Sequence, residues 1–159
     1  MELVGQWTLV SGEEAFQRLA DPKFNPLKSA IVESAPRFPS SPGKMKGDLK
    51  WNDLSTDEIE IKADNSQPCL LVISDNYSRG WKAIPAEGDS QGSYAVMPAN
   101  FFQRGIPLQP GIHHFYLEYL PRSFEVGKWI SLISLGFYLI FLGVVLGFRK
   151  TGSSALGKT

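Results

Sequence analysis

The sequence predicts a mainly β protein, an antiparallel β-sandwich with a short N-terminal helix and one C-terminal transmembrane helix. Three observations lead to this fold class. Apolar and polar residues alternate along several segments, strand-like segments recur about every ten residues between Gly or Pro turns, and residues 129–148 form an apolar run without a charge. The expected organisation is a sandwich domain over residues 1–123, a transmembrane helix over residues 124–149 and a flexible tail over residues 150–159.

The first element expected is a short helix. Ser11 and Glu14 have the spacing of a capping box, and the amphipathic segment behind them ends before Pro22. Residues 28–34 have a β-branched apolar centre and predict a strand. The prolines that follow, between residues 36 and 42, predict a long loop.

The strands of the sandwich follow from residue 46 onward. Apolar side chains alternate with polar ones around Leu49 and Trp51 and again over residues 59–64, which predicts half-buried antiparallel strands. The continuous apolar run over residues 69–75 predicts a central strand. Further strands are expected near residues 81–84, 93–97, 101–106 and 112–120.

The apolar run from Trp129 to Phe148 has the length of a membrane span. Twenty helical residues at ~1.5 Å each cover the ~30 Å hydrocarbon core of a bilayer. Residues 1–128 hold 13 basic and all 16 acidic side chains, whereas the tail holds three basic residues and no acid. By the positive-inside rule the tail is expected in the cytoplasm and the β domain outside it.

Three explanations of how the domain crosses the membrane stay open, because residues 1–16 lack the basic and apolar regions of a signal peptide. The apolar run acts as a reverse signal-anchor, or the chain is the C-terminal piece of a longer polytopic protein, or the charge rule misleads and the domain is cytoplasmic. The zero net charge gives no sign of nucleic-acid binding.

No complete catalytic or metal-binding set is recognised, so the chain is expected to be neither an enzyme nor a cofactor or metal carrier. Cys69 lies in an apolar strand and is expected in the core. His113 and His114 are adjacent and point to opposite faces of a strand, His113 toward the core, so they cannot share one ion. Residues 152–159, GSSALGKT, match the phosphate-loop pattern, but they follow a membrane helix rather than a strand, so nucleotide binding is not expected.

Two sets of residues are candidates for contacts with other molecules. The turn near residues 75–81 brings aromatic and charged side chains together, which fits either a sugar- or lipid-facing edge or a packed corner of the sandwich. The candidate contact residues there are Tyr77, Arg79, Trp81 and Arg104. In the membrane run, Gly136, Gly143 and Gly147 offer small residues against which another helix can pack.

Two segments, LLVISDNYSRGWKA at residues 70–83 and FFQRGIPLQPGIHHFYLEYLPRSFEVGKWIS at residues 101–131, resemble a known family. They are similar to the C-terminal end of the YfhO-like bacterial membrane proteins, which are polytopic and related to lipid-sugar-dependent glycosyltransferases. The residues that carry the resemblance are Asp75, Tyr77, Gly80, Trp81, Lys82, Ala83, Arg104, Gly105, Gly111, His113, Tyr119, Pro121, Gly127 and Ser131. The weaker stretch DPKFNPLKSAIVE, residues 21–33, is also similar.

The resemblance implies a β-rich module outside the cytoplasm, followed by the last membrane helix, in a bacterial inner membrane. It does not carry the activity, because the upstream helices and the acidic loop with the family's catalytic carboxylate have no counterpart in this sequence. Two functions are therefore expected to compete. The first is a single-span accessory subunit that binds other integral membrane proteins. The second is the terminal module of a split glycosyltransferase that helps to bind a glycan or lipid-linked sugar.

Overall fold

The computed structural model describes residues 1–41 and 45–155. They group into two compact units, the first Met1–Leu120 and the second beginning at Pro121. The first unit contains two β-sheets and a short helix, and the second contains one long helix. The predicted class, mainly β with a short N-terminal and a longer C-terminal helix, is confirmed.

The first sheet has four strands in the order β4-β5-β10-β7, and all neighbours are antiparallel. Its strands are β4 (Gly47–Asp53), β5 (Glu58–Asn65), β7 (Trp81–Pro85) and β10 (Gly111–Tyr119). Alternate residues of β5 and β10 are buried, as the period of two predicts.

The second sheet has six strands in the order β1-β6-β9-β8-β3-β2. Its strands are β1 (Glu2–Val4), β2 (Gln6–Leu9), β3 (Ser29–Val32), β6 (Cys69–Asn76), β8 (Met97–Ala99) and β9 (Gln103–Leu108). Only β2 and β3 are parallel. The continuous apolar run of β6 pairs with strands on both sides, as expected for a central strand.

The two edges of the six-stranded sheet meet. The edge strands β1 and β2 are consecutive in the chain and are separated only by the buried Gly5. The sheet is therefore curled, and buried residues of β1, β3, β6 and β8 share one cluster, against which the partly buried Trp7 of β2 packs. The buried members of this cluster are Val4, Ala30, Val32, Leu70, Val72, Met97 and Ala99.

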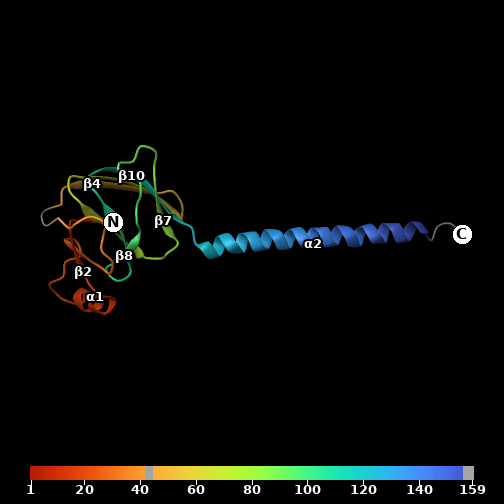
Figure 1. Cartoon of the computed structure of the whole chain (residues 1–159), viewed down its shortest axis with the longest axis horizontal. Coiled ribbons are helices and arrows are strands. Elements are labelled where there is room, and N and C mark those ends of the chain that lie inside the picture. The colour runs from red at the N-terminus through yellow and green to blue at the C-terminus, as the bar shows by residue number, and fades with distance from the viewer. Residues whose placement is uncertain (42–44, 156–159) are drawn as a thin grey trace. The chain divides into compact units, whose positions relative to one another are not determined.

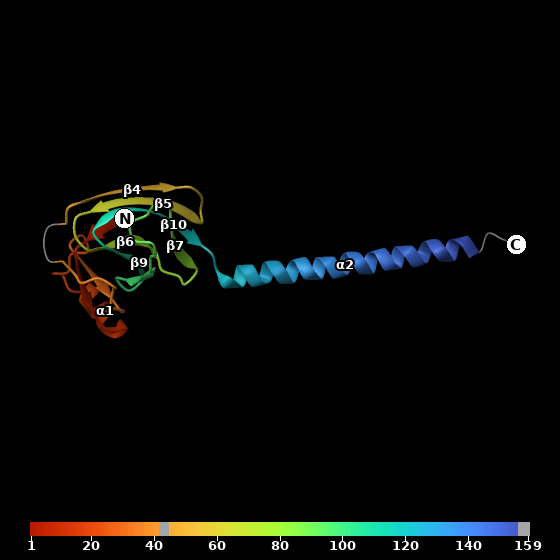
Figure 2. The ribbon, with the colours of Figure 1, turned by 45° about the horizontal axis from the view of Figure 1, so that its top comes forward.

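The main core lies between the two sheets. Its buried residues come from the inner strands of both sheets and are Ile59, Ile61, Ala63, Cys69, Leu71, Ile73, Ile106, Leu108, Phe115 and Leu117. Figure 2 shows β4, β5 and β10 in one layer above β6 and β9. The helix α1 (Gly12–Leu19) lies beyond the six-stranded sheet and packs Ala15 against Val10 and Ile31.

Several local expectations need correction. Ser11 occupies the N-cap of α1, but its side chain makes no capping hydrogen bond. Strands β1 and β2 were not expected. Residues 94–96 form no strand, and β9 begins at Gln103 rather than at residue 101. The reason for the last difference is a turn in which Asn100 and Phe101 have positive φ angles of 46° and 72°, a conformation that no strand allows.

The helix α2 runs from Arg122 to Ala155 (Figure 1). Its segment Arg122–Val144 is long and apolar enough to cross a membrane. The helix continues past residue 149, where the flexible tail was expected, because no proline interrupts it and alanine and lysine favour helix. Residues 152–155 of the phosphate-loop-like segment are helical, and residues 156–159 lie outside the described part of the chain.

Candidate functional site

The predicted contact residues surround a buried arginine. Arg104, on β9, is only 2% exposed, although arginine is almost never fully buried without partners. Its Nη2 donates to a carboxylate oxygen of Asp75 at 2.5 Å. Its guanidinium also stacks on the indole ring of Trp81, 4.0 Å from the ring centre. The attraction of the cation to the aromatic ring offsets part of the hydration free energy that the guanidinium loses on burial.

This arrangement leaves part of the guanidinium without a partner. Among the described residues, Nε and Nη1 of Arg104 are buried donors with no hydrogen bond. Burial lowers the pKa of Arg104 below its usual value, and the opposing effect of Asp75 does not fully compensate. Asp75 itself keeps 66% of its side chain exposed, so the charge pair reaches solvent only on the acidic side.

Trp81 also packs against Tyr119, and the neighbouring Gly80 leaves room for this contact. Its ring lies 5.1 Å from that of Tyr119, centre to centre, in a tilted pair. Gly80 makes this contact possible, because a Cβ at residue 80 would lie 2.6 Å from the Tyr119 ring. The backbone closes the corner, since the amide of Leu120 donates to the carbonyl of Gly80 at 2.7 Å.

The four predicted contact residues therefore differ in their accessibility. Arg104 is buried and Trp81 is partly buried, so both belong to a packed corner of the sandwich. Arg79 is exposed and Tyr77 is partly buried. The amide of Tyr77 donates to the carbonyl of Phe102 at 2.7 Å, which joins this corner to the turn between β8 and β9. The exposed phenylalanines of that turn were not singled out from the sequence.

A second polar network lies at the other end of β7. The Tyr94 hydroxyl is 2.7 and 2.8 Å from the two carboxylate oxygens of Asp89 and 2.7 Å from Nδ1 of His113. His113 is fully buried, as predicted, and its Nε2 lies 2.8 Å from the carbonyl of Gln109, so Nε2 carries a proton. His114 is partly exposed and lies 2.8 Å from Glu60.

Asp89 anchors this network electrostatically. Partial burial alone would raise the pKa of its carboxyl group, but hydrogen bonds outweigh that effect and hold the pKa below its usual value. The donors are the backbone amides of His114, Gln91 and Gly92, together with the Tyr94 hydroxyl. Burial and the neighbouring Asp89 raise the pKa of Tyr94, so the phenol stays protonated.

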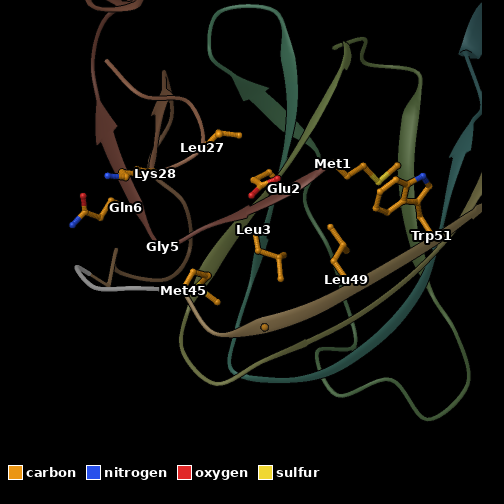
Figure 3. Close-up of a pocket in the computed structure, with 11 residues that line it drawn as sticks. Met1, Glu2, Leu3, Gly5, Gln6, Leu27, Lys28, Met45, Leu49 and Trp51 are labelled. Atoms are coloured by element: carbon orange, nitrogen blue, oxygen red, sulfur yellow. The ribbon is translucent and has the colours of Figure 1, made fainter. Parts of the chain in front are cut away.

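A pocket of about 740 Å³ lies beside β1 of the six-stranded sheet and β4 of the four-stranded sheet. In Figure 3 the side chains of Leu3, Met45 and Leu49 converge, with Met1 and Trp51 at one end and Gln6 and Lys28 at the other. Trp51 is 49% exposed. β4 is an edge strand of its sheet, so one row of its backbone hydrogen-bonding groups has no strand partner.

The remaining candidates are the glycines of α2 and the single cysteine. A Cβ at Gly136 or Gly143 would meet nothing within 4 Å, and Gly147 lies in α2 among residues whose surroundings are not described. Helix packing at these glycines stays a prediction.

Cys69 is buried in the core, and burial raises its pKa to about 12, so the reactive thiolate is suppressed at neutral pH. In residues 1–41 and 45–155, no group of three His, Cys, Asp or Glu residues is placed to hold a metal ion.

Comparison of the chain with protein-family models, with curated proteins and with solved structures finds no match. Nothing in these comparisons links the chain to the YfhO-like proteins, and that resemblance stays a prediction.

Proposed function

We propose that this protein is a non-catalytic accessory subunit of a membrane protein complex, anchored by α2 and recognising its partners through the β domain and the helix. The observation that carries the proposal is the exposure of α2. Its large apolar side chains have no cover within the described chain, and Trp129, Phe137 and Phe141 are 63%, 70% and 66% exposed. The apolar interior of a bilayer would cover such a surface, which supports the proposed anchoring.

The proposed orientation places the tail in the cytoplasm and the β domain on the outer side of a bacterial inner membrane. The asymmetry of basic residues around the apolar run supports this orientation. Protease added outside spheroplasts should digest the β domain and spare an epitope tag placed after residue 159. Protection of the β domain would reverse the orientation without affecting the proposed anchoring.

The helix glycines are proposed as the contact with another membrane helix. In lipid, helices associate by close backbone approach and van der Waals fit. Gly136 and Gly143 have open space around the Cβ position among the described residues, which supports a partner helix. Replacing Gly143 and Gly147 by Leu preserves the hydrophobic length but keeps a second helix at a distance. Co-purification of partner chains in mild detergent should weaken, whereas Val144→Leu, the matched control, should leave it unchanged.

If the glycine variant co-purifies the same chains in the same amounts, the helix is only an anchor and recognition lies in the β domain. If neither the native protein nor the variants co-purify any integral membrane protein, the proposed function is wrong. Membrane extraction of each variant with carbonate separates these outcomes from a failure of insertion.

The second candidate function is glycan or lipid-linked sugar binding. The sequence suggests Trp81 as the aromatic contact for the sugar, but the structure favours Trp51. One face of Trp81 is occupied by Arg104 and is closed to a sugar ring. Trp51 is half exposed in a pocket that also offers the polar groups of Gln6 and Lys28. Apolar and aromatic walls with a few polar groups are typical of small-molecule sites. Binding of a lipid-linked sugar that is lost in Trp51→Ala would favour this function.

A further inference from the structure

We propose that the turn between β8 and β9 rests on the lipid bilayer and inserts the side chains of Phe101 and Phe102 into its interfacial layer. This inference rests on the proposed membrane anchoring by α2. It assigns to the protein a second lipid contact, made by a turn of the β domain that precedes α2 by two strands.

The turn is built to expose two phenylalanines. Phe101 and Phe102 are 51% and 52% exposed, although each could bury a large apolar area. Phe101 has a φ of 72° and Asn100 a φ of 46°, which is the left-handed region. This conformation costs a non-glycine residue roughly 1–2 kcal/mol, and strain of this kind points to a functional constraint.

The turn is also rigid, because Asn100 is buried and fully engaged. Its side-chain oxygen accepts from the amide of Ile31 at 2.8 Å, and its side-chain nitrogen donates to Gln103 at 2.8 Å. Its own amide donates to the carbonyl of Ile31 at 2.7 Å. Phe16 of α1, 64% exposed, meets Phe101 edge to face at 6.1 Å between ring centres and enlarges the apolar surface.

This surface is linked through hydrogen bonds to the point where the chain leaves the β domain. The carbonyl of Phe102 accepts from Tyr77, and Gly80, in the same turn as Tyr77, accepts from Leu120. Leu120 is the last residue of the first unit. Two short hydrogen bonds and one turn therefore separate the phenylalanines from the exit of the chain.

The connection between the β domain and the proposed span is short. From Arg122 to the start of the apolar run at Trp129, α2 rises only ~10 Å at ~1.5 Å per residue. The headgroup layer outside the ~30 Å hydrocarbon core is about 5–8 Å thick. If the run spans the bilayer, this short connection holds the exit of the β domain near the interface, where aromatic side chains are favoured.

The test is a depth measurement on the full-length protein in vesicles of phosphatidylcholine and phosphatidylglycerol. A fluorophore is attached to Phe102→Cys, and its quenching by spin-labelled lipids is compared with that of Glu87→Cys, an exposed control beyond the far end of β7. Native Cys69 is fully buried and escapes labelling. The Phe102 label should be quenched several-fold more strongly than the Glu87 label.

Two further variants complete the test. In the Phe102→Cys protein, Phe101→Gly removes the neighbouring ring but suits the left-handed backbone, so the fold should persist while lipid quenching falls; unchanged quenching would overturn the proposal. A label at Leu139→Cys, in the middle of α2, reports on the anchor alone. Lipid quenching at Leu139 without quenching at Phe102 overturns this inference only, whereas an aqueous Leu139 label overturns the proposed anchoring. A Phe102 label shielded from water but not quenched by lipid would assign the turn to a protein contact instead.

Discussion

The charge pair of the buried Arg104 and the exposed Asp75 predicts an unequal response to the loss of its two members. Arg104 is buried with two unpartnered donors, whereas Asp75 is mostly exposed. Asp75→Ala leaves a buried cation without its counter-charge. Arg104→Met removes the cation and its unpartnered donors, and it retains a long side chain that can pack on Trp81.

The magnitudes follow from these contacts. Removing one partner of a fully buried pair costs about 3–5 kcal/mol. Because water reaches the Asp75 side chain, we expect about 2 kcal/mol for Asp75→Ala. Arg104→Met loses a charge-assisted hydrogen bond of about 1.5–3 kcal/mol and a cation–π contact with Trp81 of about 0.5–2 kcal/mol. It relieves about 1–3 kcal/mol for each of the two unpartnered donors. At the middle of these ranges gain and loss nearly cancel, so the net change should stay within about 1 kcal/mol.

The assay is thermal unfolding of the full-length variants in mild detergent, followed by tryptophan fluorescence. At about 4 °C per kcal/mol for a domain of this size, Asp75→Ala should lower Tm by roughly 8 °C and Arg104→Met by much less. Asp48→Ala is the matched control, since it breaks the exposed pair with Lys50 and should change the stability by less than about 0.5 kcal/mol. A larger loss for Arg104→Met than for Asp75→Ala would refute the reasoning from unpartnered donors.

Three further predictions concern other parts of the β domain. The folded-state pKa of Asp89 lies below its unfolded value, so the stability that the Asp89 carboxylate contributes should be complete above about pH 4 and decline as the pH falls through the folded pKa. Asp89→Asn should flatten this part of the stability–pH curve, and an unchanged slope would contradict the prediction. Gly80→Ala should cost about 1–3 kcal/mol through overlap with the Tyr119 ring, and Tyr119→Leu should recover most of it in a double-mutant cycle; full additivity would exclude that contact. Cys69 should resist a thiol reagent at pH 8 until the protein unfolds, and rapid labelling of the folded protein would show that this core opens.

The regular part of the fold could be predicted because its strands carry their own pattern. Alternation predicted β5 and β10, and the continuous apolar run predicted the central strand β6. β1 and β2 are too short to show a period, and they pair with strands that are distant in sequence, so only the tertiary structure specifies them. The strand predicted over residues 101–106 is displaced because Asn100 takes a left-handed conformation that its long-range hydrogen bonds to Ile31 stabilise.

The sequence predicted which residues form the candidate site but not which of their side chains are exposed to solvent. The sequence brought Tyr77, Arg79, Trp81 and Arg104 together, but it could not show that Arg104 faces inward. On β9, Arg104 shares a face with Ile106 and Leu108 of the core, and this alternation was the available signal. The exposure of Phe101 and Phe102 could not be read from the sequence, because two adjacent phenylalanines usually predict burial.

The meeting of β1 and β2 at Gly5 has a consequence for the order in which the chain folds. The first nine residues close the curled sheet, yet β1 pairs with β6 and β2 pairs with β3, which in turn pairs with β8. Within this domain, residues 1–9 are made before the rest and wait for Leu108, the end of β9, before the sheet is complete. At about 5–20 residues per second this delay is roughly 5–20 s. Until β6 has emerged, Leu3 and Val4 belong to a strand, β1, that lacks its partner, and this segment of the nascent chain is then most exposed to misassociation.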